Sequence, residues 1–143
     1  MKLDRAGIER LVPHAGAMCL LDEVTHWTPA AITCSSAAPA AGHPLARAGA
    51  VSAIAATEYA AQATAVHGAL LEQAQRPRAG MLATLVDVQL GSGVRVASDA
   101  LSIEAELLSR SPAGCLYAFR VSTRHAPVAS GRLMVALLPE DAQ

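Results

Sequence analysis

The residues of this chain whose types and spacing fit acid–base chemistry are His43 and Glu58. Glu58 lies in the segment GHPLARAGAVSAIAATEYAAQATAVHGALL (42–71), where most other residues are small or aliphatic. Buried acids are rare, so a carboxylate in this setting needs an explanation. The structural explanations are a surface or helix-capping role for His43 and an ion pair between Glu58 and a buried arginine. Because the two residues occur together, we favour a catalytic role for the pair.

Other common kinds of chemical site are not indicated. The sequence has no H-E-x-x-H motif and no His/Cys cluster with ligand spacing, so we expect no metal. The Gly-Ser-Gly tripeptide at 91–93 is too short for a phosphate-binding loop, and no G-x-S-x-G elbow is present. We therefore expect no cofactor and no serine hydrolase. The remaining internal histidines, His26, His67 and His125, are interpreted as structural or solvent-facing.

Length and composition indicate one folded domain covering residues 1–143, with a hydrophobic content of 52%. The net charge of -1 and the four aromatic residues provide no surface suited to nucleic acid. Cys19, Cys34 and Cys115 are odd in number and far apart, which favours reduced, buried thiols and a cytoplasmic location. The N-terminus lacks the apolar core of a secretory signal. Polar residues such as Glu58 interrupt the apolar run 48–71, so we expect a buried helix and no membrane span.

The element expected to position Glu58 is a long helix that begins between Gly49 and Ser52 and ends before Pro77. It is apolar on every side, so we expect other structure to enclose it. Asp4 is expected to cap a short N-terminal surface helix.

Six apolar stretches predict strands. Two of them, 17–27 and 30–38, precede the long helix and form a hairpin, and four follow it at 81–90, 100–109, 115–123 and 131–138. Short turns link the strands without intervening helices, which is typical of an antiparallel sheet. The sequence therefore predicts an α+β domain, with about six strands around one buried helix.

Two segments resemble motifs of the 3-hydroxyacyl-acyl carrier protein dehydratases, a hotdog-fold family. LVPHAGAMCLLDEV (11–24) is similar to their opening motif L-P-H-x-x-P-F-L-L-V-D-x-V, and HPL…TEYAAQA is similar to H-F-P-G-x-P…E-A-x-x-Q. The resemblance spans the chain and is greatest to small dehydratases of aryl polyene and related lipid pathways, whose helix signature is E-Y-x-A-Q. It implies the hotdog fold, a curved antiparallel sheet wrapped around one long helix.

The resemblance also implies an activity, the removal of water from a 3-hydroxyacyl thioester to give a trans-2-enoyl thioester. By position, His43 would be the base at C2 and Glu58 the acid that protonates the C3 hydroxyl. An imidazole titrates near neutral pH, and a carboxyl group in apolar surroundings resists ionisation, which suits these roles. Further substrate-binding groups would be the backbone amides around Ser52, Ala53 and Ile54 and the side chain of Gln62, which would face the same way as Glu58.

The chain departs from the fatty acid enzymes after His43. Their Phe-Pro-Gly is replaced by the residues 44–46, Pro-Leu-Ala, and the spacing from histidine to acid is one residue longer. An ungapped match from Glu58 places Ala53 where those enzymes have a glycine. Two alternatives therefore stay open: a hotdog thioesterase that uses water as the nucleophile, and a non-catalytic subunit of a heteromeric dehydratase.

The expected partners follow from the same resemblance. They are an acyl carrier protein with a phosphopantetheine-linked acyl chain, and a second hotdog chain in a homodimer, a larger even-numbered assembly or a hetero-oligomer. Ten of the eleven basic residues are arginines, and Arg47, Arg76 and Arg78 are candidates for docking the carrier. His14 and Asp22, in the opening motif, are expected to have structural roles through turn formation and hydrogen bonding.

Overall fold

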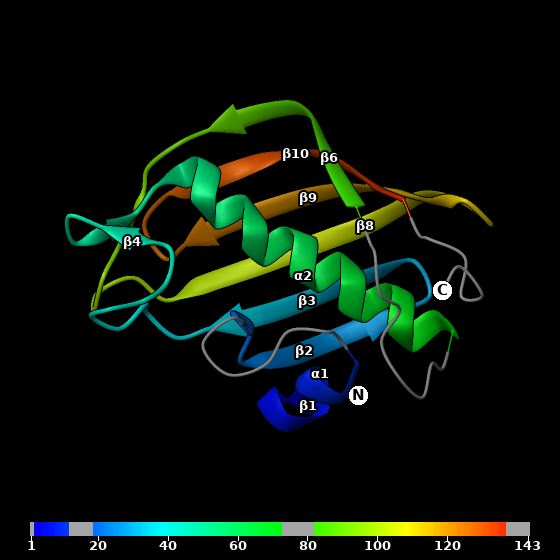
Figure 1. The fold of residues 1–143 in the computed structure, drawn as a ribbon, viewed down its shortest axis with the longest axis horizontal. Helices are drawn as coiled ribbons and strands as arrows, with labels where there is room; N and C mark the ends of the chain where they lie inside the picture. The colour runs from blue at the N-terminus through cyan, green and yellow to red at the C-terminus, as the bar shows by residue number, and fades with distance from the viewer. Residues whose placement is uncertain (1, 12–18, 73–81, 137–143) are drawn as a thin grey trace.

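In the computed structural model, which describes residues 2–11, 19–72 and 82–136, one long helix lies across a seven-stranded antiparallel sheet (Figure 1). The strand order is β1-β2-β3-β8-β9-β10-β6. In that order the strands are Leu3–Asp4, Glu23–Thr28, Ala31–Ser36, Leu101–Ser111, Gly114–Thr123, Pro127–Ala136 and Leu82–Leu90. The predicted α+β hotdog architecture is confirmed. Six of the seven strands match the six predicted stretches, and β1 is the addition.

The central strands bury alternate side chains, as their sequences predict. In β8, Leu101, Ile103 and Ala105 are buried, whereas the residues that alternate with them, Ser102, Glu104 and Glu106, are exposed. In β9, Tyr117, Phe119 and Val121 lie on the buried side. This period of two gives the sheet one apolar face, and α2 (Ala53–Glu72) packs on the sheet by contacting β3, β6, β8, β9 and β10.

Both helices begin at capping residues. The Asp4 carboxylate accepts a hydrogen bond of 2.9 Å from the Gly7 amide at the start of α1 (Arg5–Leu11), which confirms the predicted cap. Ile8 of this helix is fully buried, so α1 belongs to the core more than the surface assignment implied. The long helix begins one residue after the expected interval because Ser52 is its cap, accepting from the Ala55 amide at 3.2 Å. Pro77 lies outside the described residues.

The expectation that α2 is enclosed on every side is wrong for the single chain. One side of the helix is buried against the sheet, including Tyr59, Ala60 and Ala63. On another side Ile54 is 51% exposed and Glu58 is exposed. The sheet covers only one side of the helix, so an apolar helix surface remains open.

A second, three-stranded sheet lies next to the start of α2 and was not predicted. Its strands are β4 (Ala46–Arg47), β5 (Ala50–Val51) and β7 (Val94–Arg95) in that order. It ties the segment between His43 and Ser52 to the chain that follows β6. The histidine and the start of the helix are therefore held by one local framework.

The buried histidine of α2 has a structural role, as expected. His67 is fully buried, and its Nδ1 lies 2.7 Å from the Tyr117 hydroxyl. Its Nε2 lies 2.8 Å from the carbonyl oxygen of Thr28, which only accepts, so Nε2 carries the proton and Nδ1 accepts from the tyrosine. The pair links α2 to β9 and to the end of β2.

The three cysteines are free thiols, of which Cys19 and Cys34 are buried and Cys115 is half-buried. No helix among the described residues is long and apolar enough to cross a membrane.

Candidate active site

A pocket of about 350 Å³ lies between the loop that leads to His43 and the side of α2 that carries Tyr59. The loop residues 37–44 form one wall, and five of the eight are alanine or glycine. The rest of the lining comes from Arg5, Cys19, Leu20, Asp22 and Tyr59. Only one residue of the predicted site, His43, lines this pocket.

Both ring nitrogens of His43 have partners. Nδ1 accepts a hydrogen bond of 3.1 Å from the Leu45 amide, and Nε2 lies 3.2 Å from the hydroxyl of Tyr59. Because Nδ1 accepts, we assign the proton of the neutral ring to Nε2, which therefore donates to the Tyr59 oxygen. The two rings are stacked, with an interplanar angle of 10° and centroids 6.2 Å apart.

These contacts keep His43 neutral. Desolvation lowers the pKa of His43. The Leu45 amide acts in the same direction, because an imidazolium has a proton on Nδ1 and cannot accept this hydrogen bond. The neutral form shown here has no lone pair on Nε2. To act as a base through Nε2, His43 must first hold its proton on Nδ1, and the contact with Leu45 must open.

The second polar group at this point is the phenol of Tyr59, a residue that is 1% exposed. Burial raises the pKa of Tyr59 to about 12, and the negative charge of Asp22 acts in the same direction. The hydroxyl is therefore protonated at neutral pH and serves as a hydrogen-bond donor.

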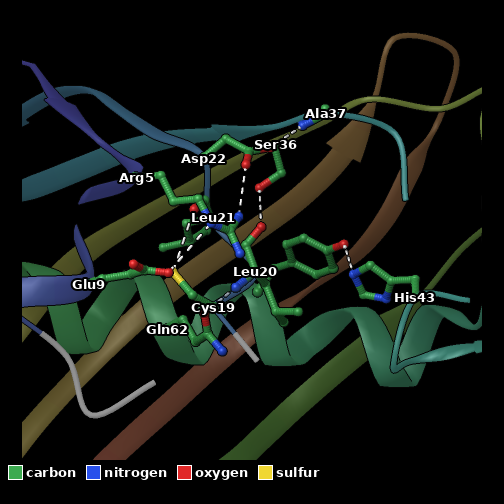
Figure 2. A network of polar contacts seen from close by, with 11 residues as sticks. Arg5, Glu9, Cys19, Leu20, Leu21, Asp22, Ser36, Ala37, His43 and Gln62 are labelled. Atoms are coloured by element: carbon green, nitrogen blue, oxygen red, sulfur yellow. Dashed lines mark hydrogen bonds and ion pairs between the residues drawn. The ribbon is translucent and has the colours of Figure 1, made fainter. Parts of the chain in front are cut away.

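Asp22 holds the opposite side of the pocket together (Figure 2). One carboxylate oxygen accepts from Arg5 at 3.0 Å, and the other accepts from the Ala37 amide at 2.7 Å. These bonds join α1, the segment before β2 and the start of the loop wall. The expected hydrogen-bonding role of Asp22 is confirmed, whereas His14 lies outside the described residues.

Glu58 and Gln62 do not share an environment. Glu58 is exposed, does not line the pocket, and makes no hydrogen bond or ion pair within the described part of the chain. Gln62 is 2% exposed, and its side-chain oxygen accepts from the Leu20 amide at 2.9 Å. Gln62 thus anchors the segment before β2 to the helix, in contrast to the expectation that it faces the same way as Glu58.

The backbone groups predicted to bind a thioester oxygen also lie outside the pocket lining. The Ser52 hydroxyl is engaged as the helix cap, Ala53 is 9% exposed, and Ile54 is largely exposed. The burial expected to keep Glu58 protonated is likewise missing in the single chain.

Tyr59 is the site residue that sequence reasoning missed. It directly follows Glu58 in the TEYAAQA segment, where attention to the carboxylate and the glutamine left the tyrosine unassigned. Among the described residues, no group of three or more His, Cys, Asp or Glu side chains could hold a metal ion.

Comparisons with solved structures place the fold among known proteins. The dehydratase heterocomplex ApeI:P from Xenorhabdus doucetiae contains a chain with a TM-score of 0.81 and 19% identity, covering 93% of this chain and 91% of that one. A hypothetical thioesterase with coenzyme A from Streptococcus pneumoniae gives a TM-score of 0.57 at 10% identity, with coverage of 82% and 85%. A Streptococcus mutans protein bound to acetyl-CoA gives 0.58 at 9% identity, with coverage of 82% and 88%.

No curated protein matches the sequence. The profile of the ApeP dehydratase family matches residues 6–143, which include every element of the domain except β1 and the first residue of α1. A match over nearly the whole chain, together with the hotdog architecture and a histidine at the pocket before the long helix, gives one conclusion. The chain belongs to the ApeP-like dehydratase family.

Proposed function

We propose that this chain acts as a 3-hydroxyacyl-acyl carrier protein dehydratase, a carbon–oxygen lyase that converts a 3-hydroxyacyl thioester into a trans-2-enoyl thioester. The observation that carries this proposal is the neutral imidazole of His43 at the wall of a pocket, in a chain of a dehydratase family. A neutral imidazole is the form of histidine that can take up a proton near physiological pH.

The proposed elimination uses His43 and Glu58. His43, once its proton is on Nδ1, removes the C2 proton of the substrate. The electron pair forms the C2–C3 double bond as the C3–O bond breaks, and protonated Glu58 donates a proton to the departing hydroxyl, which leaves as water. A well-placed base of this kind contributes roughly 10²–10⁴-fold to the rate.

We further propose that the Glu58 of each site comes from a second chain. Glu58 is exposed and absent from the pocket that contains His43 of the same chain. The uncovered side of α2 would gain burial from a partner, and β6, an edge strand of the sheet, offers hydrogen-bonding groups for pairing. The heterocomplex neighbour supports a different hotdog protein as the partner, and a second copy of this chain is the alternative proposal.

The delivered substrate in this proposal is an acyl chain on the phosphopantetheine arm of an acyl carrier protein. Arg47 lies four residues after His43, is exposed, and donates to the carbonyl oxygens of Pro44 and Ala46 at 3.2 and 2.7 Å. Its charge therefore lies on the loop that continues from the pocket wall. Arg76 and Arg78 lie outside the described residues. The free cysteines support a reducing compartment, the cytoplasm.

The test is product analysis. The full-length chain, alone and with its hotdog partner, is incubated with 3-hydroxyacyl carrier thioesters of several lengths, and the products are identified by mass. We expect loss of one water with the thioester intact. Release of a free 3-hydroxy acid would identify a thioesterase. Inactivity of the chain alone with activity in the complex would show a subunit that needs its partner.

Substitution tests the residue assignment. His43→Ala and Glu58→Gln should each abolish nearly as much activity as the two together, because effects within one catalytic unit are strongly non-additive. A folded variant of either kind that keeps most of the dehydration activity would contradict the assignment.

A further inference from the structure

The hydroxyl group of Tyr59 has one contact in the described part of the chain, and that contact uses only its oxygen. The oxygen accepts from Nε2–H of His43 at 3.2 Å, which leaves the phenolic hydrogen without an acceptor among the described residues. Tyr59 is 1% exposed and lines the pocket. A buried donor without a partner is unfavourable, so a group that enters the pocket with an oxygen acceptor gains a hydrogen bond.

We propose that Tyr59 is a further catalytic residue whose hydroxyl donates a hydrogen bond to the C3 hydroxyl oxygen of the substrate. This inference rests on the proposed dehydratase function and names the contact that recognises its leaving group. The backbone amides expected to bind the thioester oxygen lie outside the pocket lining, and the C3 oxygen, which Glu58 protonates as it leaves, is the substrate acceptor that a donor beside His43 would assist. Negative charge develops on this oxygen as the C3–O bond breaks, and a preorganised donor stabilises it.

The donors at this point form a directed chain. The Leu45 amide donates to Nδ1 of His43, Nε2–H donates to Tyr59, and Tyr59 is left to donate to the ligand. Hydrogen bonds in such a chain polarise one another, so while His43 holds its proton on Nε2 and a ligand enters, the Tyr59 phenol, whose oxygen already accepts, is a stronger donor. The arrangement recognises an oxygen atom, and a saturated acyl chain has none at C3.

A competing reading assigns the opposite effect to the same hydroxyl. When His43 carries its proton on Nδ1, the Tyr59 hydroxyl could donate to the free Nε2 lone pair. If this is the sole role of the hydroxyl, Tyr59 blocks the nitrogen that removes the C2 proton, and deleting the hydroxyl makes that nitrogen available. Tyr59→Phe separates the two readings, because it lowers activity in the first and preserves or raises it in the second.

The experiment compares full-length wild type with Tyr59→Phe. The matched control is Tyr117→Phe, which removes the other tyrosine hydroxyl that is bonded to a histidine on α2, at 2.7 Å from His67 and outside the pocket lining. Binding of a 3-hydroxyacyl-pantetheine and of the saturated acyl-pantetheine of equal length is measured by calorimetry, and turnover by product mass. Both measurements use the chain with its hotdog partner, because Glu58 of each site is proposed to come from a second chain.

We expect wild type to bind the 3-hydroxyacyl ligand about 10-fold more tightly than the saturated one, in line with one hydrogen bond. Tyr59→Phe should bind both equally and turn over substrate about 10²-fold more slowly, the usual effect of losing a transition-state donor. Tyr117→Phe should keep the preference and the turnover. A merely structural role of Tyr59 would weaken binding of both ligands alike.

A folded Tyr59→Phe chain that keeps the hydroxyl preference, or that turns over substrate as fast as wild type, would overturn the inference and leave the dehydratase function standing. A wild type that binds neither ligand and forms no enoyl product would overturn both. Should Tyr59→Phe fail to fold, 3,5-difluorotyrosine at this position keeps the shape and lowers the pKa of the phenol. Turnover should then decline at a lower pH than in wild type, and an unchanged pH profile would reject the inference.

Discussion

Protonation of the buried His67 should make the domain lose stability as the pH falls. This side chain is fully buried, donates from Nε2 to the Thr28 carbonyl and accepts at Nδ1 from Tyr117. Desolvation lowers the pKa of His67, the bond to Thr28 opposes this shift, and the positive charge of Arg110 adds to the lowering. The folded chain therefore holds His67 neutral at a pH where the unfolded chain protonates it.

The sign and size of the effect follow from proton linkage. In the unfolded chain the histidine has its ordinary pKa of about 6.5, so below this pH the unfolded state binds the extra proton and gains stability. Stability is then fully present above pH 6.5 and falls as the pH decreases toward the folded-state value. If His67 stays neutral in the folded chain, the loss between pH 7.5 and pH 5.5 is about 1.4 kcal/mol.

The assay is urea unfolding at these two pH values for wild type and for His67→Gln. Glutamine retains hydrogen-bonding groups but does not titrate. Because each protein's free energy of unfolding is compared between the two pH values, any destabilisation by the substitution that does not depend on pH cancels. His43, whose pKa is also lowered, contributes equally to both proteins and cancels. The wild type should lose more stability than the variant between pH 7.5 and pH 5.5, by up to about 1.4 kcal/mol.

An equal loss in wild type and His67→Gln would refute the reasoning, because it would show that the buried ring takes up its proton in the folded state.

Three further outcomes are expected. Mixing inactive His43→Ala and Glu58→Gln chains should restore part of the dehydration activity through dimers that carry one intact site, and no rescue after verified subunit exchange would place each site within one chain. Arg47→Glu should reduce turnover of carrier-linked substrate much more than turnover of a pantetheine analogue, with a difference that shrinks at high salt, whereas equal losses would mean that the carrier docks elsewhere. Burial raises the pKa of Cys34 to about 12, so this thiol should react with an alkylating reagent at pH 8 only when urea unfolds the chain. Peptide mass mapping identifies the labelled cysteines, and a label on Cys34 in the folded chain would contradict its burial.

The larger elements were predictable because their signals are periodic. The alternation in β8 depends on neighbouring residues alone, and the strand buries the side chains that it predicts. The capping residues Asp4 and Ser52 likewise act on the next few residues and lie at the starts of α1 and α2. The two-residue strands β4, β5 and β7 were not predictable, since a pair of residues shows no period. Their pairing depends on how the loop before α2 meets the chain after β6.

The candidate site was predictable only in part, for a reason that concerns the helix. His43 stands out because its type and its place before the helix are visible in the sequence. On α2 the residues are apolar all round, so the sequence does not say which side faces the sheet. Glu58 and Tyr59 are neighbours about 100° apart around the axis, and only the packing of α2 turns the tyrosine toward His43 and leaves the glutamate outside.

The loop wall of the pocket can be remodelled in one direction only. Four of the residues in 37–42 are alanines and one is glycine, so almost every replacement adds atoms to the wall. Trimming Leu20 or Tyr59 would enlarge the pocket, but these residues are buried, so their loss leaves an unfilled volume in the core. Substitutions in the loop therefore reduce the size of the ligands that fit the pocket. A pocket for larger ligands requires changes in buried residues, and the stability lost there has to be restored elsewhere in the fold.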